Sequence, residues 1–184
     1  MRLTRSKFLS DAELVRFMAA VRDRRHVHQP RDHALFALLA NTGMRPSEAL
    51  ALTRADLHLG ARPPWVQITR LKKRVPACDD ISIPGALASV LKTYLDGVET
   101  ERVFPISRRQ AERLFHFYAK AACIRGRYLY ALRHTAATKI YRVTRNIKIV
   151  QTILGHEKAD TSALYAHIPK SVMEQLTGQM TVHV

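Results

Sequence analysis

With 184 residues, the chain is long enough for one domain with a buried core, and its length does not indicate two. Its 30 basic and 15 acidic residues give a formal net charge of +15, which favours a polyanionic partner such as nucleic acid. No membrane span, disulfide framework or zinc site is expected, because no apolar stretch approaches roughly 18 to 20 residues and Cys78 and Cys123 form no paired motif.

The first part of the chain predicts three helices separated by polar or glycine-containing turns. Ser10 and Glu13 form the pattern of an N-terminal capping box, and the apolar residues that follow predict a helix over residues 11–22. Pro30 begins a second helix, which is expected to end near Gly43. Pro46 then begins a short third helix.

Residues 65–84 change to an alternating pattern that predicts a small β-hairpin. The segments WVQITR and ISIP are its strands, and LKKRVPACDD connects them, which places Asp79 and Asp80 in the loop. Helical spacing returns at 85–95, after Ser107, and in short pieces at 131–143, 146–154, 159–167 and 169–177. The predicted fold is mainly α with a small antiparallel β-sheet (α+β), in a single domain over residues 1–184.

Four short motifs, far apart in the sequence, carry the residue types needed to attack a phosphodiester. They are TGMRPSEAL, ALRHTAAT, LGHEK and ALYAH, which contain Arg45, Arg133, His156 and Tyr165. The attack builds negative charge on the phosphorane, which guanidinium groups compensate well. A tyrosine beside cations can lose its proton as it attacks. Each residue alone would more often be a surface or packing residue, but the combination favours phosphodiester cleavage.

Through these motifs the chain resembles the catalytic domain of the tyrosine recombinases, the phage integrase family, from about Phe8 to Gln175. The resemblance implies the fold of the DNA breaking-rejoining catalytic core. It also implies a site-specific DNA recombinase that cleaves and rejoins strands through a covalent 3′-phosphotyrosyl intermediate. No cofactor, metal or ATP is implied.

The resemblance also implies roles for individual residues. Tyr165 would be the nucleophile, with Arg45, Arg133 and His156 as further catalytic residues. Lys72 matches the hairpin lysine that protonates the leaving 5′ oxygen in the family. The supporting residues would be Glu48, which holds Arg45, and His134, which is structural.

The chain departs from the family pattern at one position. The family usually has a histidine three residues before the second arginine, where this chain has Tyr130 in YALRH. A tyrosine can donate a hydrogen bond to a phosphate oxygen, although it cannot carry positive charge as histidine can. Tyr130 is therefore a candidate catalytic residue.

The expected partner is double-stranded DNA, bound by a homotetramer and assisted by an accessory DNA-bending protein, at a cytoplasmic, DNA-associated location. Basic residues of the hairpin and of the helix after Ser107 are expected to contact DNA, namely Arg70, Lys73, Arg74, Arg108 and Arg109. The N-terminal DNA-binding domain usual in the family is expected to be absent, because only 44 residues precede Arg45. A naturally short recombinase and an excised catalytic domain are both compatible with this length.

Two other interpretations stay open. A type IB topoisomerase would share the arginines, the histidine and the tyrosine, whereas a non-catalytic DNA-binding regulator would keep the fold and lack efficient cleavage. The target site and the choice among integration, inversion, resolution and transposition do not follow from the sequence. His26, His28 and His33 lie close together, near the expected surface, but no cysteine or carboxylate completes a metal site.

Overall fold

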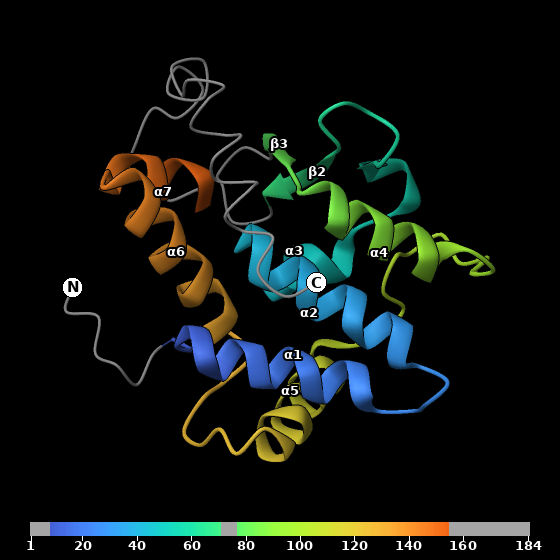
Figure 1. The fold of residues 1–184 in the computed structure, drawn as a ribbon. Coiled ribbons are helices and arrows are strands. Elements are labelled where there is room, and N and C mark those ends of the chain that lie inside the picture. Colours follow the sequence, from blue (N-terminus) through green and yellow to red (C-terminus); the bar gives the residue numbers. More distant parts are fainter. Residues whose placement is uncertain (1–7, 71–76, 155–184) are drawn as a thin grey trace.

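In the computed structural model, which describes residues 8–70 and 77–154, helix α2 (Gln29–Thr42) occupies the centre of the molecule. Helices α1 (Asp11–Asp23), α4 (Gly85–Leu95) and α6 (Ala131–Thr144) pack against it. Figure 1 shows α6 and α7 (Ile147–Leu154) on one side of α2, and the sheet and α4 on the other. Helix α3 (Pro46–Ala51) follows α2 directly, and α5 (Arg108–Ala121) packs against α1.

The helix ends follow the capping signals in the sequence. Ser10 caps α1, where its hydroxyl accepts from the Glu13 amide (3.2 Å) and the Glu13 carboxylate accepts from the Ser10 amide (2.8 Å). Ser107 and Gln110 repeat the arrangement at α5. Gly43 ends α2 in the left-handed conformation, with φ of 64°. The helices predicted over 11–22, from Pro30 to Gly43 and from Pro46 are therefore confirmed to within about two residues.

The sheet is antiparallel, with strand order β1 (Leu57–His58), β2 (Trp65–Arg70) and β3 (Ala77–Ser82). The hairpin is confirmed, but the placement of Asp79 and Asp80 in its loop is wrong. Both lie in β3, opposite Ile68 and Gln67 of β2. Asp80 is exposed and accepts a hydrogen bond from Gln67 Nε2 (3.3 Å), whereas Asp79, opposite the buried Ile68, is partly buried. The mainly α fold with a small antiparallel sheet is confirmed.

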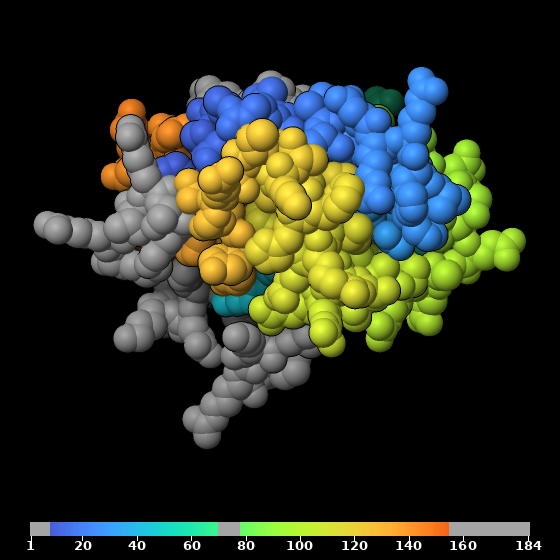
Figure 2. Space-filling view, turned by 90° about the horizontal axis from the view of Figure 1, so that it is seen from below, coloured from blue at the N-terminus to red at the C-terminus, as the bar shows by residue number. Residues whose placement is uncertain are grey.

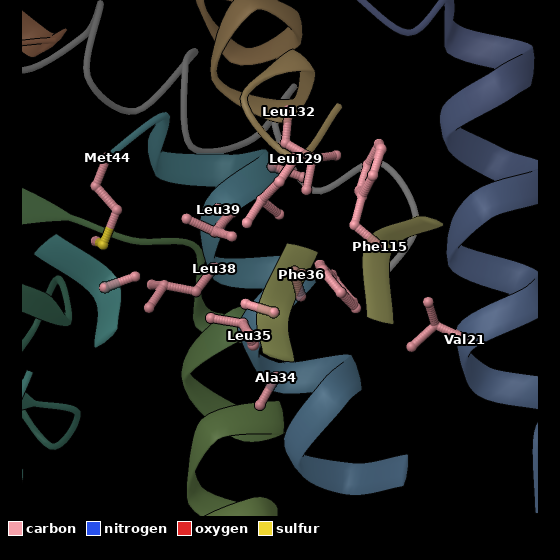
Figure 3. Packing of buried hydrophobic residues seen from close by; sticks show 14 of the residues in the cluster. Val21, Ala34, Leu35, Phe36, Leu38, Leu39, Met44, Phe115, Leu129 and Leu132 are labelled. Carbon is pink, nitrogen blue, oxygen red and sulfur yellow. The ribbon is translucent and has the colours of Figure 1, made fainter. Parts of the chain in front are cut away.

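The hydrophobic core surrounds α2, most of whose side chains are buried (Figure 3). Aromatic rings hold α1, α2 and α5 together, since Phe17 lies 5.2 Å from Phe36 and 5.1 Å from Phe115 between ring centroids. Core residues that are seen in Figure 3 come from α1, α2, α5 and the start of α6, among them Val21, Leu35, Leu38, Leu39 and Leu132.

One polar contact is buried within this core. The Tyr118 hydroxyl of α5 donates to Asp32 Oδ2 of α2 (2.8 Å), and Arg31 forms an ion pair with the same carboxylate (2.7 Å). Burial, followed by the bond to Asp32, raises the pKa of Tyr118 to about 12, so the phenol stays protonated at neutral pH. The contact fixes α5 against α2.

The described ranges contain no helix that is both long and apolar enough to cross a membrane. The helices expected at 159–167 and 169–177 lie outside those ranges.

Candidate active site

Arg45 stands at the junction between α2 and α3. It is the residue before α3, and its backbone amide donates to Glu48 Oε2 (2.6 Å). Its side chain turns to the same carboxylate, with Nη1 2.8 Å from Glu48 Oε1. The Glu48 side chain is 2 % exposed and that of Arg45 is 19 % exposed, so a buried carboxylate holds a partly accessible guanidinium in one orientation. This is the supporting contact expected for Glu48.

Arg133 lies in the first turn of α6 and is buried, with 4 % of its surface exposed. Its Nη1 donates to the carbonyl oxygen of Gly43 (2.7 Å), and its Nη2 donates to the carbonyl oxygen of Leu154 (2.8 Å). One guanidinium therefore connects the turn after α2, the start of α6 and the end of α7. The candidate catalytic side chain of Arg133 is therefore buried and bonds two backbone carbonyls.

The Gly43 turn is packed closely against α6 and α7. A Cβ atom built on Gly43 would lie 2.7 Å from Leu154 Cδ2 and 3.0 Å from Ala136 Cβ. Glycine is therefore required there both for its positive φ and for the close approach. Gly43 precedes Arg45 by two positions, and Leu154 precedes His156 by two, so Arg133 is bonded beside two of the other motifs.

Tyr130 immediately precedes α6 and is 41 % exposed. Its ring centroid lies 5.3 Å from that of His134, with an angle of 68° between the ring planes, and 5.9 Å from Arg133 Cζ. The phenol is thus accessible beside a guanidinium, which is the setting in which it could donate a hydrogen bond to an anion. His134 packs against Tyr130, and its supporting role stays a prediction.

The remaining candidates divide into those that the structure describes and those that it does not. Arg108 and Arg109 begin α5 and are exposed, and Arg108 forms an ion pair with Glu112 (3.0 Å). Arg70 ends β2, and only its backbone is described. Outside the described residues lie Lys72, Lys73, Arg74, His156 and Tyr165.

The three histidines noted in the sequence do not form a site. His26 and His28 are exposed, with ring centroids 5.3 Å apart, whereas His33 is partly buried in α2. Burial, and secondarily the charge of Arg22, lowers the pKa of His33. Its buried Nε2 has no hydrogen-bond partner among the described residues. Over 8–70 and 77–154, no group of three His, Cys, Asp or Glu side chains is placed to hold a metal ion.

The carbonyl groups that accept from Arg133 were not predicted. Backbone acceptors carry no residue-specific signal, and the partners lie 90 and 21 residues away in the chain. The glycine at the end of α2 was the available clue, since it indicates a turn that another element can approach closely.

The amino-acid sequence is similar to a known protein family and to several of its curated members. A model of the phage integrase family matches residues 7–171. The tyrosine recombinase XerC of Neisseria gonorrhoeae is 30% identical over 153 residues, which are 75% of this chain and 47% of the relative. The chain thus spans about half the length of the curated relatives that it matches.

Solved structures agree on the fold. The XerH site-specific recombinase bound to its difH substrate, in a pre-cleavage complex, matches with a TM-score of 0.72 at 22% identity, over 90% of this chain and 51% of that one. A lambda integrase tetramer bound to a Holliday junction matches with a TM-score of 0.65 at 18% identity, over 88% of this chain and 50% of that one.

Proposed function

The chain belongs to the phage integrase family, and from that membership we propose that it supplies the catalytic domain of a site-specific DNA recombinase. It cleaves and rejoins DNA strands through a covalent 3′-phosphotyrosyl intermediate. The observation that carries the proposal is the arrangement around Arg133, whose guanidinium is bonded to the turn beside Arg45 and to the end of α7. That arrangement brings segments from three motifs to one place.

In the proposed reaction, the Tyr165 oxygen attacks the scissile phosphorus while the bond from phosphorus to the 5′ oxygen breaks. The tyrosine releases its proton to solvent water as it attacks, and the leaving 5′ oxygen gains one from Lys72. The strand is left with a 3′-phosphotyrosine and a free 5′-hydroxyl. Attack by a DNA hydroxyl reverses the step and reforms the phosphodiester, so no external energy source is needed.

The arginines supply the charge compensation in this scheme. The phosphorane carries more negative charge than the ground state, and guanidinium groups oriented before the reaction stabilise it without reorganising. Glu48 orients Arg45 through two contacts. The carbonyls of Gly43 and Leu154 orient Arg133.

Tyr130 and His156 complete the contacts with the phosphate. The accessible Tyr130 phenol lies beside Arg133 and donates to a non-bridging oxygen. It supplies a hydrogen bond where the family's usual histidine would also supply charge. His156 donates from the segment after α7.

The proposed partner is double-stranded DNA, bound by a homotetramer, in a cytoplasmic and DNA-associated setting. The family membership, the net charge of +15 and the exposed Arg108 and Arg109 support DNA as the partner. XerH bound to difH and the lambda integrase tetramer on a Holliday junction are the relatives on which the assembly is proposed. An accessory DNA-bending protein is part of the same proposal.

The proposal is tested by trapping the covalent intermediate. Nicked suicide duplexes from DNA that flanks the coding sequence are incubated with the protein, and SDS-resistant protein–DNA adducts are separated on a gel. An adduct should form with the unaltered chain and with the control Tyr141→Phe, and it should be lost in Tyr165→Phe. Salt-sensitive DNA binding without any adduct would contradict the proposed cleavage.

A further inference from the structure

A cavity of about 270 Å³ adjoins the candidate active site. It lies between the start of α3, one face of α5 and the loop before α6, and its lining includes Pro46, Arg108, Glu112, His116, Tyr128 and Tyr130. Figure 2 shows the loop and α5 meeting on one face of the molecule, with a small part of the α3 region visible beside them. Pro46 follows Arg45 and Tyr130 is itself a candidate, so whatever occupies the cavity lies beside these candidate residues.

Aromatic side chains form one wall of the cavity and are held in place. Tyr128 is 70 % exposed, yet the His116 ring packs against it nearly perpendicularly, with centroids 5.8 Å apart. The backbone carbonyl of Tyr128 accepts a hydrogen bond from the Ala131 amide (2.8 Å) at the start of α6. The neighbouring Arg127 is bonded to the carbonyl of Phe8 (3.1 Å). An exposed ring on an anchored loop is suited to stacking, because little order has to be imposed when a partner arrives.

The α5 side of the cavity offers a hydrogen-bond donor and an acceptor side by side. Arg108 Nε lies 3.0 Å from Glu112 Oε1 on successive turns of α5, and the two side chains are 67% and 43% exposed. A guanidinium donates only and a carboxylate accepts only. The edge of every nucleobase carries both acceptors and donors, so such a pair can meet a base edge. The carboxylate would repel a phosphate, which disfavours the DNA backbone as the occupant.

From these features we propose that the cavity binds one unstacked nucleobase of the cleaved strand. The inference rests on the proposed recombinase function, and it names a site for the strand end that cleavage releases. Extracting a base from an intact duplex costs free energy, and the cost is smallest for a base that is already unpaired. Once the 5′-hydroxyl end is free, its terminal base can leave the helix. Stacking on Tyr128 then compensates for the base pair that is lost.

The test uses photochemical crosslinking of a trapped complex. Suicide duplexes carry 5-iodouracil in turn at each position on both sides of the mapped cleavage point, and long-wave ultraviolet light couples a stacked base to an aromatic side chain. A crosslink to Tyr128 is expected from one position at the released 5′ end. The yield should fall about tenfold or more in Tyr128→Ala, since stacking on an aromatic ring is lost. It should persist in Tyr128→Phe, which keeps the ring, and in Tyr141→Ala, an exposed tyrosine of α6 outside the cavity.

Adduct formation is measured on the same samples, so that the two proposals can fail separately. If the adduct forms and no position crosslinks to Tyr128, the base site is wrong and the recombinase function stands. Crosslinking to Tyr128 from duplex positions far from the cleavage point would also overturn the base site, because it would indicate ordinary surface contact. If no adduct forms with any substrate, the proposed function itself fails.

Discussion

Arg133 Nη1 donates a hydrogen bond of 2.7 Å to the carbonyl oxygen of Gly43, which lies 90 residues earlier in the chain. Its Nη2 donates to Leu154 at 2.8 Å, so a buried guanidinium satisfies two backbone carbonyls at the ends of two helices. Helix C-termini carry negative partial charge and attract cations. The same residue that is proposed to stabilise the phosphorane therefore also holds the parts of the site together.

Arg133→Lys should destabilise the protein. A lysine ammonium lacks the planar fork that reaches both carbonyls, and a buried carbonyl that loses its partner costs about 1–3 kcal/mol. Urea denaturation measures the free energy of unfolding. Arg109→Lys, at an exposed position of α5, is the matched control and should change it little. Equal unfolding free energies for the two variants would contradict the bridging role of Arg133.

Gly43→Ala should destabilise the protein more than Gly97→Ala. Both glycines have positive φ, 64° and 83°, so both variants carry backbone strain. A Cβ at Gly43 meets Leu154 at 2.7 Å, whereas one at Gly97 meets nothing within 4 Å among the described residues. The extra loss at Gly43 is expected to be about 1–3 kcal/mol, the usual cost of overpacking. Thermal and urea unfolding of the two variants give this difference, and its absence would mean that α7 does not pack on the turn.

Glu48→Gln should reduce cleavage more than it reduces DNA affinity. The variant keeps the size of the side chain but removes the charge that fixes the Arg45 guanidinium. Loss of orientation at a reacting centre can lower a rate by about 100-fold. Single-turnover adduct formation and DNA binding are measured in parallel, with Glu99→Gln, an exposed position, as control. An equal fall in both quantities would indicate general damage to the fold.

Tyr130→His should keep or raise the rate of cleavage. The imidazole restores the family's usual residue and adds positive charge beside Arg133 when it is protonated. The gain should therefore be largest below about pH 6.5, the ordinary pKa of histidine. Adduct formation is followed across pH for both proteins. A collapse of cleavage, with unchanged circular dichroism, would show that Tyr130 does not occupy the histidine position.

His33 should make the protein less stable in acid. Its folded pKa is below the ordinary value of 6.5, mainly because of burial, so the unfolded state takes up a proton more readily as the pH falls. The contribution of neutral His33 to the free energy of unfolding is therefore fully present above pH 6.5 and is lost as the pH falls through the folded pKa. Urea denaturation across this range should show a shallower loss in His33→Gln. His26→Gln, an exposed position, should behave like the unaltered protein.

Much of the fold could be predicted from local signals. The capping pair Ser10 and Glu13, the glycine that ends α2 and the alternation in β2 each act within a few residues, which is why they can be recognised in the sequence. Strand β1 was missed because two residues are too few to show a periodic pattern. Asp79 and Asp80 were misplaced because carboxylates are typical of turns, while strand β3 holds Asp80 on its exposed face and Asp79 in a partly buried position.

The contacts of the candidate site could be predicted where the two partners are close together in the sequence. Arg45 and Glu48 are three residues apart, and their contact follows from one helical turn. The partners of Arg133 depend on how α2, α6 and α7 pack, which no short motif specifies. The cavity beside Tyr128 likewise combines three distant segments.

The most direct test of the central claim is to locate the covalent bond. The trapped adduct is digested with nuclease and protease, and mass spectrometry identifies the peptide that retains a nucleotide. We predict a phosphodiester remnant on Tyr165 and on no other tyrosine. A remnant on Tyr130, or a protein that recombines its DNA with no covalent intermediate, would contradict the account.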